Sequence, residues 1–254
     1  MGTYYSMGGI SKLPTTSDKL DGWTEVFLYN PTTTLCRAHI TAYFEDRDPV
    51  TLEPAEEIKP QNSHLLVMPR WHSEVFNDAG FWALRLDSNT ALDPIVIQVM
   101  KPYEDMPREA AFKGGVSNLL PCQLHREWHF ADGLWLNWTD HLKGDIAKAP
   151  FPFNELEYYY FLNPGDRPAQ VDMTLQFRRL EPMTFHLTVP ARRLLAWCNW
   201  GKIPYNQAYG VKVGSSEPIA TTSVRYIYGL RGFDEWGIQL HCAMPAKPGP
   251  WTAW

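Results

Sequence analysis

The 254-residue sequence lacks long apolar runs and clusters of basic residues. No apolar stretch approaches the roughly 18 residues that a membrane-spanning helix needs, so we expect no insertion into a membrane. No run of Lys or Arg exceeds two residues and the net charge is −5, which disfavours nucleic acid as a partner. The first residues show neither the basic nor the apolar region of a signal peptide, and the expected location is the cytoplasm.

Motifs of nucleophilic and nucleotide-dependent catalysis are also missing. The sequence contains no G-x-S-x-G, no Gly-rich phosphate loop and no H-E-x-x-H. Its four cysteines lie far apart without a C-x-x-C, so we expect reduced core residues. These absences disfavour serine hydrolysis and nucleotide chemistry, and leave open whether the chain is an enzyme.

Helical periodicity is scarce, whereas the alternation typical of strands is frequent. Apolar and polar residues alternate over residues 23–29, 171–177 and 185–189, which predicts strands with one buried face. The 21 Pro and 17 Gly suit a chain with many turns. The sequence therefore predicts an all-β protein built from antiparallel sandwiches.

The chain contains the same pattern twice. Four pairs of segments match in the same order: 29–31 with 162–164, 39–44 with 172–177, 83–86 with 210–213, and 93–96 with 217–220. A weaker match joins 4–10 to 128–134. The repeat predicts two tandem antiparallel β-sandwich domains related by internal duplication, residues 1–118 and residues 119–254, the second with a C-terminal extension.

Aromatic residues are unusually abundant, with 11 Trp, 12 Tyr and 12 Phe. Most aromatic rings in a β-sandwich fill its core. Since side chains alternate along a strand, however, the run Tyr158-Tyr159-Tyr160 must direct at least one ring outward. An outward ring can stack on the face of a sugar.

Segments of the second copy carry a family resemblance. They are His129-Phe130-Ala131-Asp132-Gly133, the stretch 157–165, the stretch 188–193 with Val-Pro-Ala-Arg-Arg, and the stretch 215–220. In this order they resemble the family named after the soluble transducer of a microbial sensory rhodopsin. The resemblance covers most of the second copy and, more faintly, the first.

The resemblance implies an antiparallel β-sandwich that assembles as an oligomer and binds a small molecule or carbohydrate. In the type member it also implies a membrane photoreceptor as partner. For this chain we expect a homo-oligomer, a dimer of tandem chains. Function is expected in the second copy, because Thr24 of the first copy stands where the family motif has a Glu. The expected ligand-binding residues are Trp128, Asp132, Glu157, Tyr158, Tyr160, Arg192 and Arg193.

One strand face of the second copy suggests a divalent metal. His125, Glu127 and His129 alternate and would share a face, with about 6.5 to 7 Å for each two-residue step. Imidazole and carboxylate groups are ligands for zinc, manganese or iron. The alternative is a solvated edge strand whose polar face holds two histidines.

A pair of carboxylates offers a second kind of chemistry. Glu155 and Glu157 lie two residues apart on one strand face, where close carboxylates can raise one another's pKa enough for acid–base work. The alternative is an ordinary exposed face. The sequence thus leaves two functions open: a carbohydrate-binding protein, or a metal-dependent carbohydrate-active lyase or isomerase that uses Glu155 or Glu157 as base.

Overall fold

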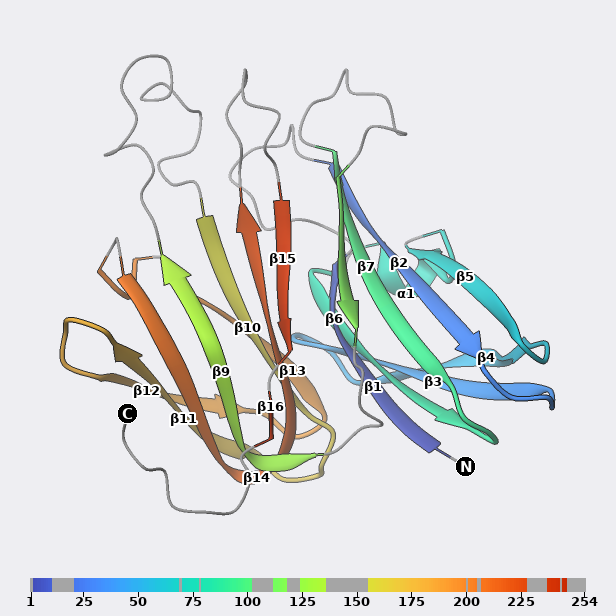
Figure 1. The fold of residues 1–254 in the computed structure, drawn as a ribbon. Helices are drawn as coiled ribbons and strands as arrows, with labels where there is room; N and C mark the ends of the chain where they lie inside the picture. Colours follow the sequence, from blue (N-terminus) through green and yellow to red (C-terminus); the bar gives the residue numbers. More distant parts are fainter. Residues whose placement is uncertain are drawn as a thin grey trace.

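The computed structural model describes residues 2–10, 21–68, 70–77, 79–101, 112–117, 124–135, 155–199, 201–204, 207–227, 237–242 and 244–245. Within them the fold is antiparallel β with one short helix, which confirms the predicted all-β class (Figure 1). No helix in these ranges is long and apolar enough to cross a membrane.

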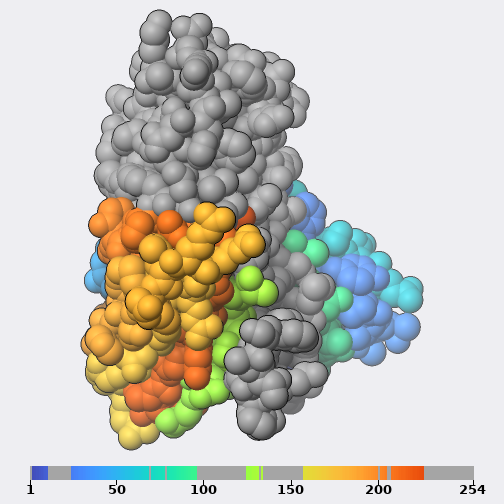
Figure 2. Space-filling model, turned by 60° about the vertical axis from the view of Figure 1, so that its left-hand side comes forward, coloured from blue at the N-terminus to red at the C-terminus, as the bar shows by residue number. Residues whose placement is uncertain are grey.

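The elements of the first half are β1 (Gly2–Ile10), β2 (Asp21–Asn30), β3 (Cys36–Phe44), β4 (Val50–Ile58), β5 (Asn62–Met68), α1 (Ser73–Phe76), β6 (Phe81–Ser88), β7 (Asp93–Lys101) and β8 (Phe112–Ser117). The elements of the second half are β9 (His125–Trp135), β10 (Glu155–Asn163), β11 (Ala169–Phe177), β12 (Met183–Val189), β13 (Arg193–Cys198), β14 (Gln207–Ile227), β15 (Gly237–Cys242) and β16 (Met244–Pro245). Figure 2 shows the second half in front, in light green to red, and the first half, mostly in blue, beside it.

The two halves share one order of strand pairing. The sheets of the first half run β1-β6-β3-β4 and β5-β2-β7-β8. In the second half, β9 and β11 flank the first part of β14 and β12 follows β11. The last part of β14 lies between β10 and β15, and β13 follows β10. The long strand β14 therefore takes the places of both β6 and β7.

The strand registers correct one of the aligned segments. Phe27 pairs with Ile95, and its counterpart Tyr160 pairs with Thr222. Ile95 thus corresponds to Thr222, whereas the sequence alignment matched it to Ile219. The likeness of residues 93–96 to 217–220 is a coincidence of composition, because the short connection 89–92 between β6 and β7 corresponds to residues inside β14.

A bulge lies at the same point of β1 and β9. The pairing of β1 with β6 shifts between Ser6 and Gly9, and the pairing of β9 with β14 shifts just before Gly133. A Cβ atom on Gly9 would lie 2.1 Å from the Trp82 ring, and one on Gly133 would lie 2.2 Å from the Tyr209 ring. Each glycine is therefore needed because an aromatic ring of the neighbouring strand lies directly over it.

The core of each half is formed by side chains of alternate strand residues. In the second half, Phe130 of β9 meets Tyr159 of β10 with ring centroids 5.3 Å apart, so side chains of these two strands pack against each other. In the first half, Phe76 of α1 packs on Trp82 of β6 at 5.0 Å. Cys36 is buried as a free thiol, and burial raises its pKa.

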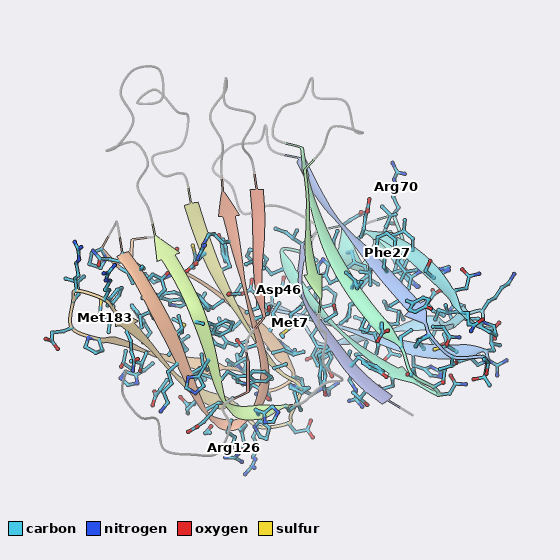
Figure 3. The ribbon with its side chains drawn as sticks, in the orientation of Figure 1. Met7, Phe27, Asp46, Arg70, Arg126 and Met183 are labelled. Atoms are coloured by element: carbon cyan, nitrogen blue, oxygen red, sulfur yellow. The ribbon has the colours of Figure 1, made fainter. Side chains whose placement is uncertain are left out.

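Several strands form the junction between the halves: β8 lies beside β15, β1 beside β14, and β3 and β6 contact β13. The Phe81 ring lies 4.8 Å from that of Tyr158 and 5.2 Å from that of Tyr160. The Glu45 carboxylate accepts a hydrogen bond of 2.7 Å from the Ala196 N–H. Asp46, which follows Glu45, lies between the halves in Figure 3. This junction is therefore both apolar and hydrogen-bonded.

Candidate functional site

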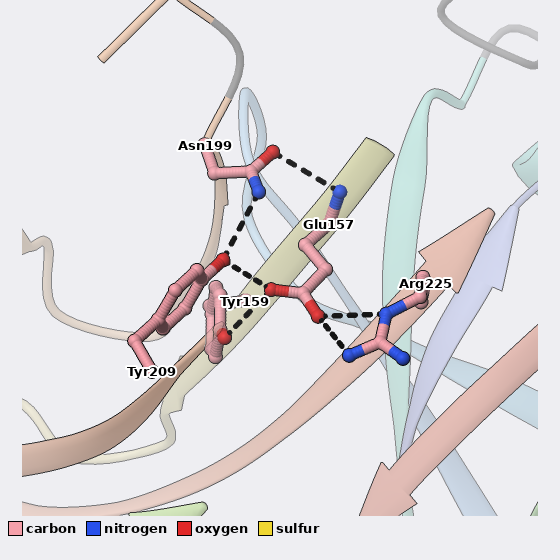
Figure 4. Close-up of polar contacts among 5 residues, drawn as sticks. All are labelled: Glu157, Tyr159, Asn199, Tyr209 and Arg225. Carbon is pink, nitrogen blue, oxygen red and sulfur yellow. Dashed lines mark hydrogen bonds and ion pairs between the residues drawn. The ribbon is translucent and has the colours of Figure 1, made fainter. Parts of the chain in front are cut away.

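A buried ionic cluster surrounds Glu157, the residue that the family motif singled out (Figure 4). Arg225 of β14 donates to Glu157 Oε1 from Nε at 2.9 Å and from Nη2 at 2.7 Å. The Tyr159 and Tyr209 hydroxyls donate to Oε2 at 3.0 and 2.5 Å. Asn199 links two members of the cluster. Its Oδ1 accepts from the Glu157 N–H and its Nδ2 donates to the Tyr209 hydroxyl, both at 3.1 Å.

Strand alternation explains why this cluster lies inside the second half. Glu157 and Tyr159 point into the space between the sheets, and the bulge region of β14 brings Tyr209 to them from the opposite sheet. The side chains of Glu157 and Arg225 are only 1% and 4% exposed. Burial and the neighbouring Glu157 charge raise the pKa of Tyr159 and Tyr209 well above the ordinary value for a phenol.

The cluster satisfies the Glu157 carboxylate with four donors. A buried carboxylate needs such partners, because desolvation of an unpaired charge is strongly unfavourable. With both oxygens occupied, Glu157 joins the two sheets and is not placed as a free base. The Glu155 side chain, its predicted companion, lies outside the described residues.

A pocket of about 380 Å³ opens where β9 begins and β10 ends. Its lining residues are Leu124, Asn163, Gly165, Asp166, Arg167, Glu217 and Pro218. The Glu217 side chain is 21% exposed and lies 2.9 Å from Arg167 Nη2 and 3.7 Å from Arg126 Nη2. Arg126 also donates to the Ser216 carbonyl and lies at the lower end of the second half in Figure 3.

The floor of this pocket is held by Asn163. Its amide donates to the Arg167 carbonyl at 2.8 Å, and its Oδ1 accepts from the Gly165 N–H at 3.1 Å. These hydrogen bonds fix the shape of the turn after β10. The Arg167 side chain extends from this turn to Glu217. Carboxylates and guanidinium groups on one wall can bind hydroxyl groups as acceptors and donors.

The predicted sugar-stacking tyrosines lie at the junction of the halves. Alternation predicted correctly that Tyr158 and Tyr160 point away from Tyr159, and their rings are roughly parallel at 6.3 Å. Phe81 of the first half packs against both. Tyr158 is 9% exposed and Tyr160 is fully buried, so neither ring face is open to solvent.

The two adjacent arginines occupy a turn and a strand start. Arg192 has φ 56° in the turn before β13, so it lies outside the strand. Its N–H donates to the Gly165 carbonyl at 2.9 Å. Arg193 begins β13 and forms an ion pair of 2.8 Å with Asp48 of the first half. The second arginine therefore links the halves.

The remaining ligand candidates lie near β9. The Trp128 indole is 7% exposed and donates to the carbonyls of Ile219 at 3.0 Å and His125 at 3.2 Å. It therefore ties β9 to β14 behind the pocket. The Asp132 side chain lies outside the described residues.

The candidate metal ligands follow β9 as the alternation predicts. Glu127 pairs with Gly214 and His129 with Lys212, while His125 lies beyond a register shift. Burial and the nearby Lys212 charge lower the pKa of His129, and Glu127 opposes this effect. Among the described residues, no group of three or more His, Cys, Asp and Glu side chains is arranged to hold a metal ion.

Comparison with known proteins yields only distant likenesses. No protein-family model and no curated protein matches the chain. The crystal structure of Thermotoga maritima 1070 is 18% identical, with a TM-score of 0.40 over 49% of this chain and 97% of that one. The Anabaena sensory rhodopsin transducer is 23% identical, with a TM-score of 0.31 over 40% of this chain and 97% of that one. Each likeness extends over less than half of this chain.

Proposed function

We propose that the chain is a tandem duplication of one β-sandwich domain, similar to the sensory rhodopsin transducer, and that it serves as a non-catalytic binding protein. Duplication is supported by the common order of strand pairing and by the equivalent glycines, Gly9 under Trp82 and Gly133 under Tyr209. Two unrelated domains would not be expected to share both a topology and a glycine covered by a ring.

The ligand we propose is a small polyhydroxylated molecule, such as a sugar, in the pocket beside Glu217. The observation that carries this proposal is the pocket itself, whose volume of about 380 Å³ lies in the range of small-molecule sites. Glu217 and Asp166 supply acceptors for hydroxyl groups, and Arg167 supplies donors. Leu124 and Pro218 supply apolar surface for the C–H groups of a sugar ring.

The equivalent place in the first half lacks this charge pattern. The strand registers give the counterparts of the charged residues in the first half: Thr90 occupies the position of Glu217, Thr34 that of Arg167 and Thr33 that of Asp166. The asymmetry supports a site in the second half only. Glu217 already forms ion pairs with Arg126 and Arg167, an arrangement that holds its carboxylate in place as an acceptor.

Thermal unfolding with a panel of neutral sugars and uronic acids tests the proposal. A bound ligand at 100 times its dissociation constant stabilises the folded state by about 2.7 kcal/mol. We expect Glu217→Gln to abolish the stabilisation, because the ligand loses its charged acceptor. The matched control is Glu57→Gln, which removes a surface ion pair with Arg37 in the first half and should leave binding unchanged.

The same titration separates the pocket from the residues of the family motif. Binding that survives Glu217→Gln but is lost in Arg192→Ala would move the site to the motif residues around Arg192. A panel in which no compound shifts the unfolding temperature would contradict a sugar-binding function.

A further inference from the structure

One sheet face of the first half carries an exposed apolar row, next to the polar residues Ser63, Glu25 and Asp93. Leu65, Phe27 and Ile95 lie in one cross-strand row over β5, β2 and β7. Leu65 and Ile95 are 45% and 36% exposed, and Tyr29, two residues along β2, is 41% exposed. Phe27 lies on the side of the molecule away from the second half (Figure 3). We call Leu65, Phe27, Ile95 and Tyr29 the β2 face.

The corresponding face of the second half is an interface within the chain. By the strand registers, Tyr160 corresponds to Phe27 and Ala196 to Leu65. Tyr160 is fully buried against Phe81, and the Ala196 N–H is bonded to Glu45. In this fold, therefore, the outer face of this sheet is a surface on which another domain packs.

The second half does not carry the residues needed to repeat that contact on the β2 face. By the strand registers, Ala208 is the counterpart of Phe81. Arg178 is the counterpart of Glu45, because each is the residue after a corresponding phenylalanine. Neither an alanine nor an arginine supplies a ring to cover Phe27. A head-to-tail ring of chains, which would use this contact, is therefore disfavoured.

We propose that the β2 face is the dimer interface of this protein, covered by the same face of a second copy. A twofold contact brings a surface onto itself, so an apolar row meets an apolar row. Aromatic and branched apolar side chains clustered on one exposed surface are typical of protein interfaces. This inference does not depend on the proposed sugar pocket, which lies in the other half.

Sedimentation equilibrium or light scattering of the full chain tests the interface. We expect a particle of twice the chain mass of 29.2 kDa. Leu65→Lys should shift the mass to that of one chain, because a twofold contact places two lysines in an apolar interface. Leu180→Lys is the matched control: Leu180 is 42% exposed but lies in the turn between β11 and β12, so its dimer should persist.

A second charge change decides between the two geometries. Lys212 lies on the face of the second half that a head-to-tail ring of chains would use. In a twofold dimer this face is not buried, so Lys212→Glu should leave the dimer intact. A wild-type chain of single mass, or loss of association in Lys212→Glu or Leu180→Lys but not in Leu65→Lys, would overturn the proposal. Circular dichroism and the unfolding midpoint of each variant establish that a change in mass does not result from unfolding.

Discussion

Asn30 and Asn163 make the same hydrogen bonds in the two halves of the chain. Asn30 donates to the carbonyls of Thr34, Ile58 and Lys59 at 2.8 to 3.1 Å, and its oxygen accepts from the Thr32 N–H at 3.0 Å. Asn163 donates to the carbonyls of Arg167, Val189 and Pro190 at 2.8 to 3.2 Å and accepts from Gly165. Each side chain therefore joins two turns at one end of its half.

Substitution of either asparagine by alanine is predicted to destabilise the protein by about 3 kcal/mol. Both residues are fully buried, so the carbonyls they serve would lose their partner without access to water. Urea unfolding of Asn30→Ala and Asn163→Ala measures the change. Asn62→Ala, on an exposed residue whose side-chain oxygen accepts from the adjacent Ser63 N–H, should stay within about 0.5 kcal/mol of the wild type. An effect in only one half would argue against equivalent roles.

The bulge glycines lead to a second prediction. Gly133→Ala is expected to destabilise the fold by at least about 2 kcal/mol, since its Cβ would lie within 2.2 Å of a Tyr209 ring that is held by hydrogen bonds. Gly214→Ala provides the control on the paired strand, because nothing lies within 4 Å of its added Cβ. Similar unfolding midpoints for the two variants would show that the ring moves aside freely.

Local patterns predicted the all-β class of the fold. Alternation over residues 171–177 is a property of neighbouring residues, and the Asn-Pro turns mark where strands end. The same local reasoning failed at residues 217–220. The Glu-Pro-Ile sequence resembles the start of β7, yet β14 continues through it, and only the pairing partners reveal the true register.

The candidate sites were harder to predict because their partners are distant in the chain. Glu157 was identified from a motif, but Arg225 and Tyr209 reach it through strand pairing across 68 and 52 residues. The alternation of side chains along the strand predicted that Tyr158 points away from the core of its own half. It could not show that Phe81 of the other half covers it, because no local pattern encodes contacts between halves.

The metal hypothesis for His125, Glu127 and His129 is tested by elemental analysis of the purified protein. We expect less than one equivalent of zinc, manganese or iron. Four residues along a strand separate the histidines by about 13 Å, whereas bonds from zinc to imidazole are about 2.0 Å long. Lys212 beside His129 also opposes a cation. One equivalent of metal, lost in His129→Ala but kept in His186→Ala, would instead support the metal-dependent enzyme.

Alkaline pH is predicted to destabilise the protein through Tyr159 and Tyr209. Burial and Glu157 hold the pKa of both phenols well above their ordinary value near 10, which they regain on unfolding. Below pH 10 both states keep these protons, so the phenols add no pH dependence. Above pH 10 the unfolded state releases protons that the folded state retains, and the free energy of unfolding falls by up to about 1.4 kcal/mol per pH unit for each phenol.

The variant Tyr209→Phe isolates this effect. It should lower stability at neutral pH, because Glu157 loses a donor, but it should also make the decline above pH 10 less steep. Urea unfolding between pH 8 and 11 measures both quantities. Equal slopes for the wild type and Tyr209→Phe would mean that the Tyr209 hydroxyl ionises as readily in the folded protein as in the unfolded chain, contrary to its position against the buried carboxylate.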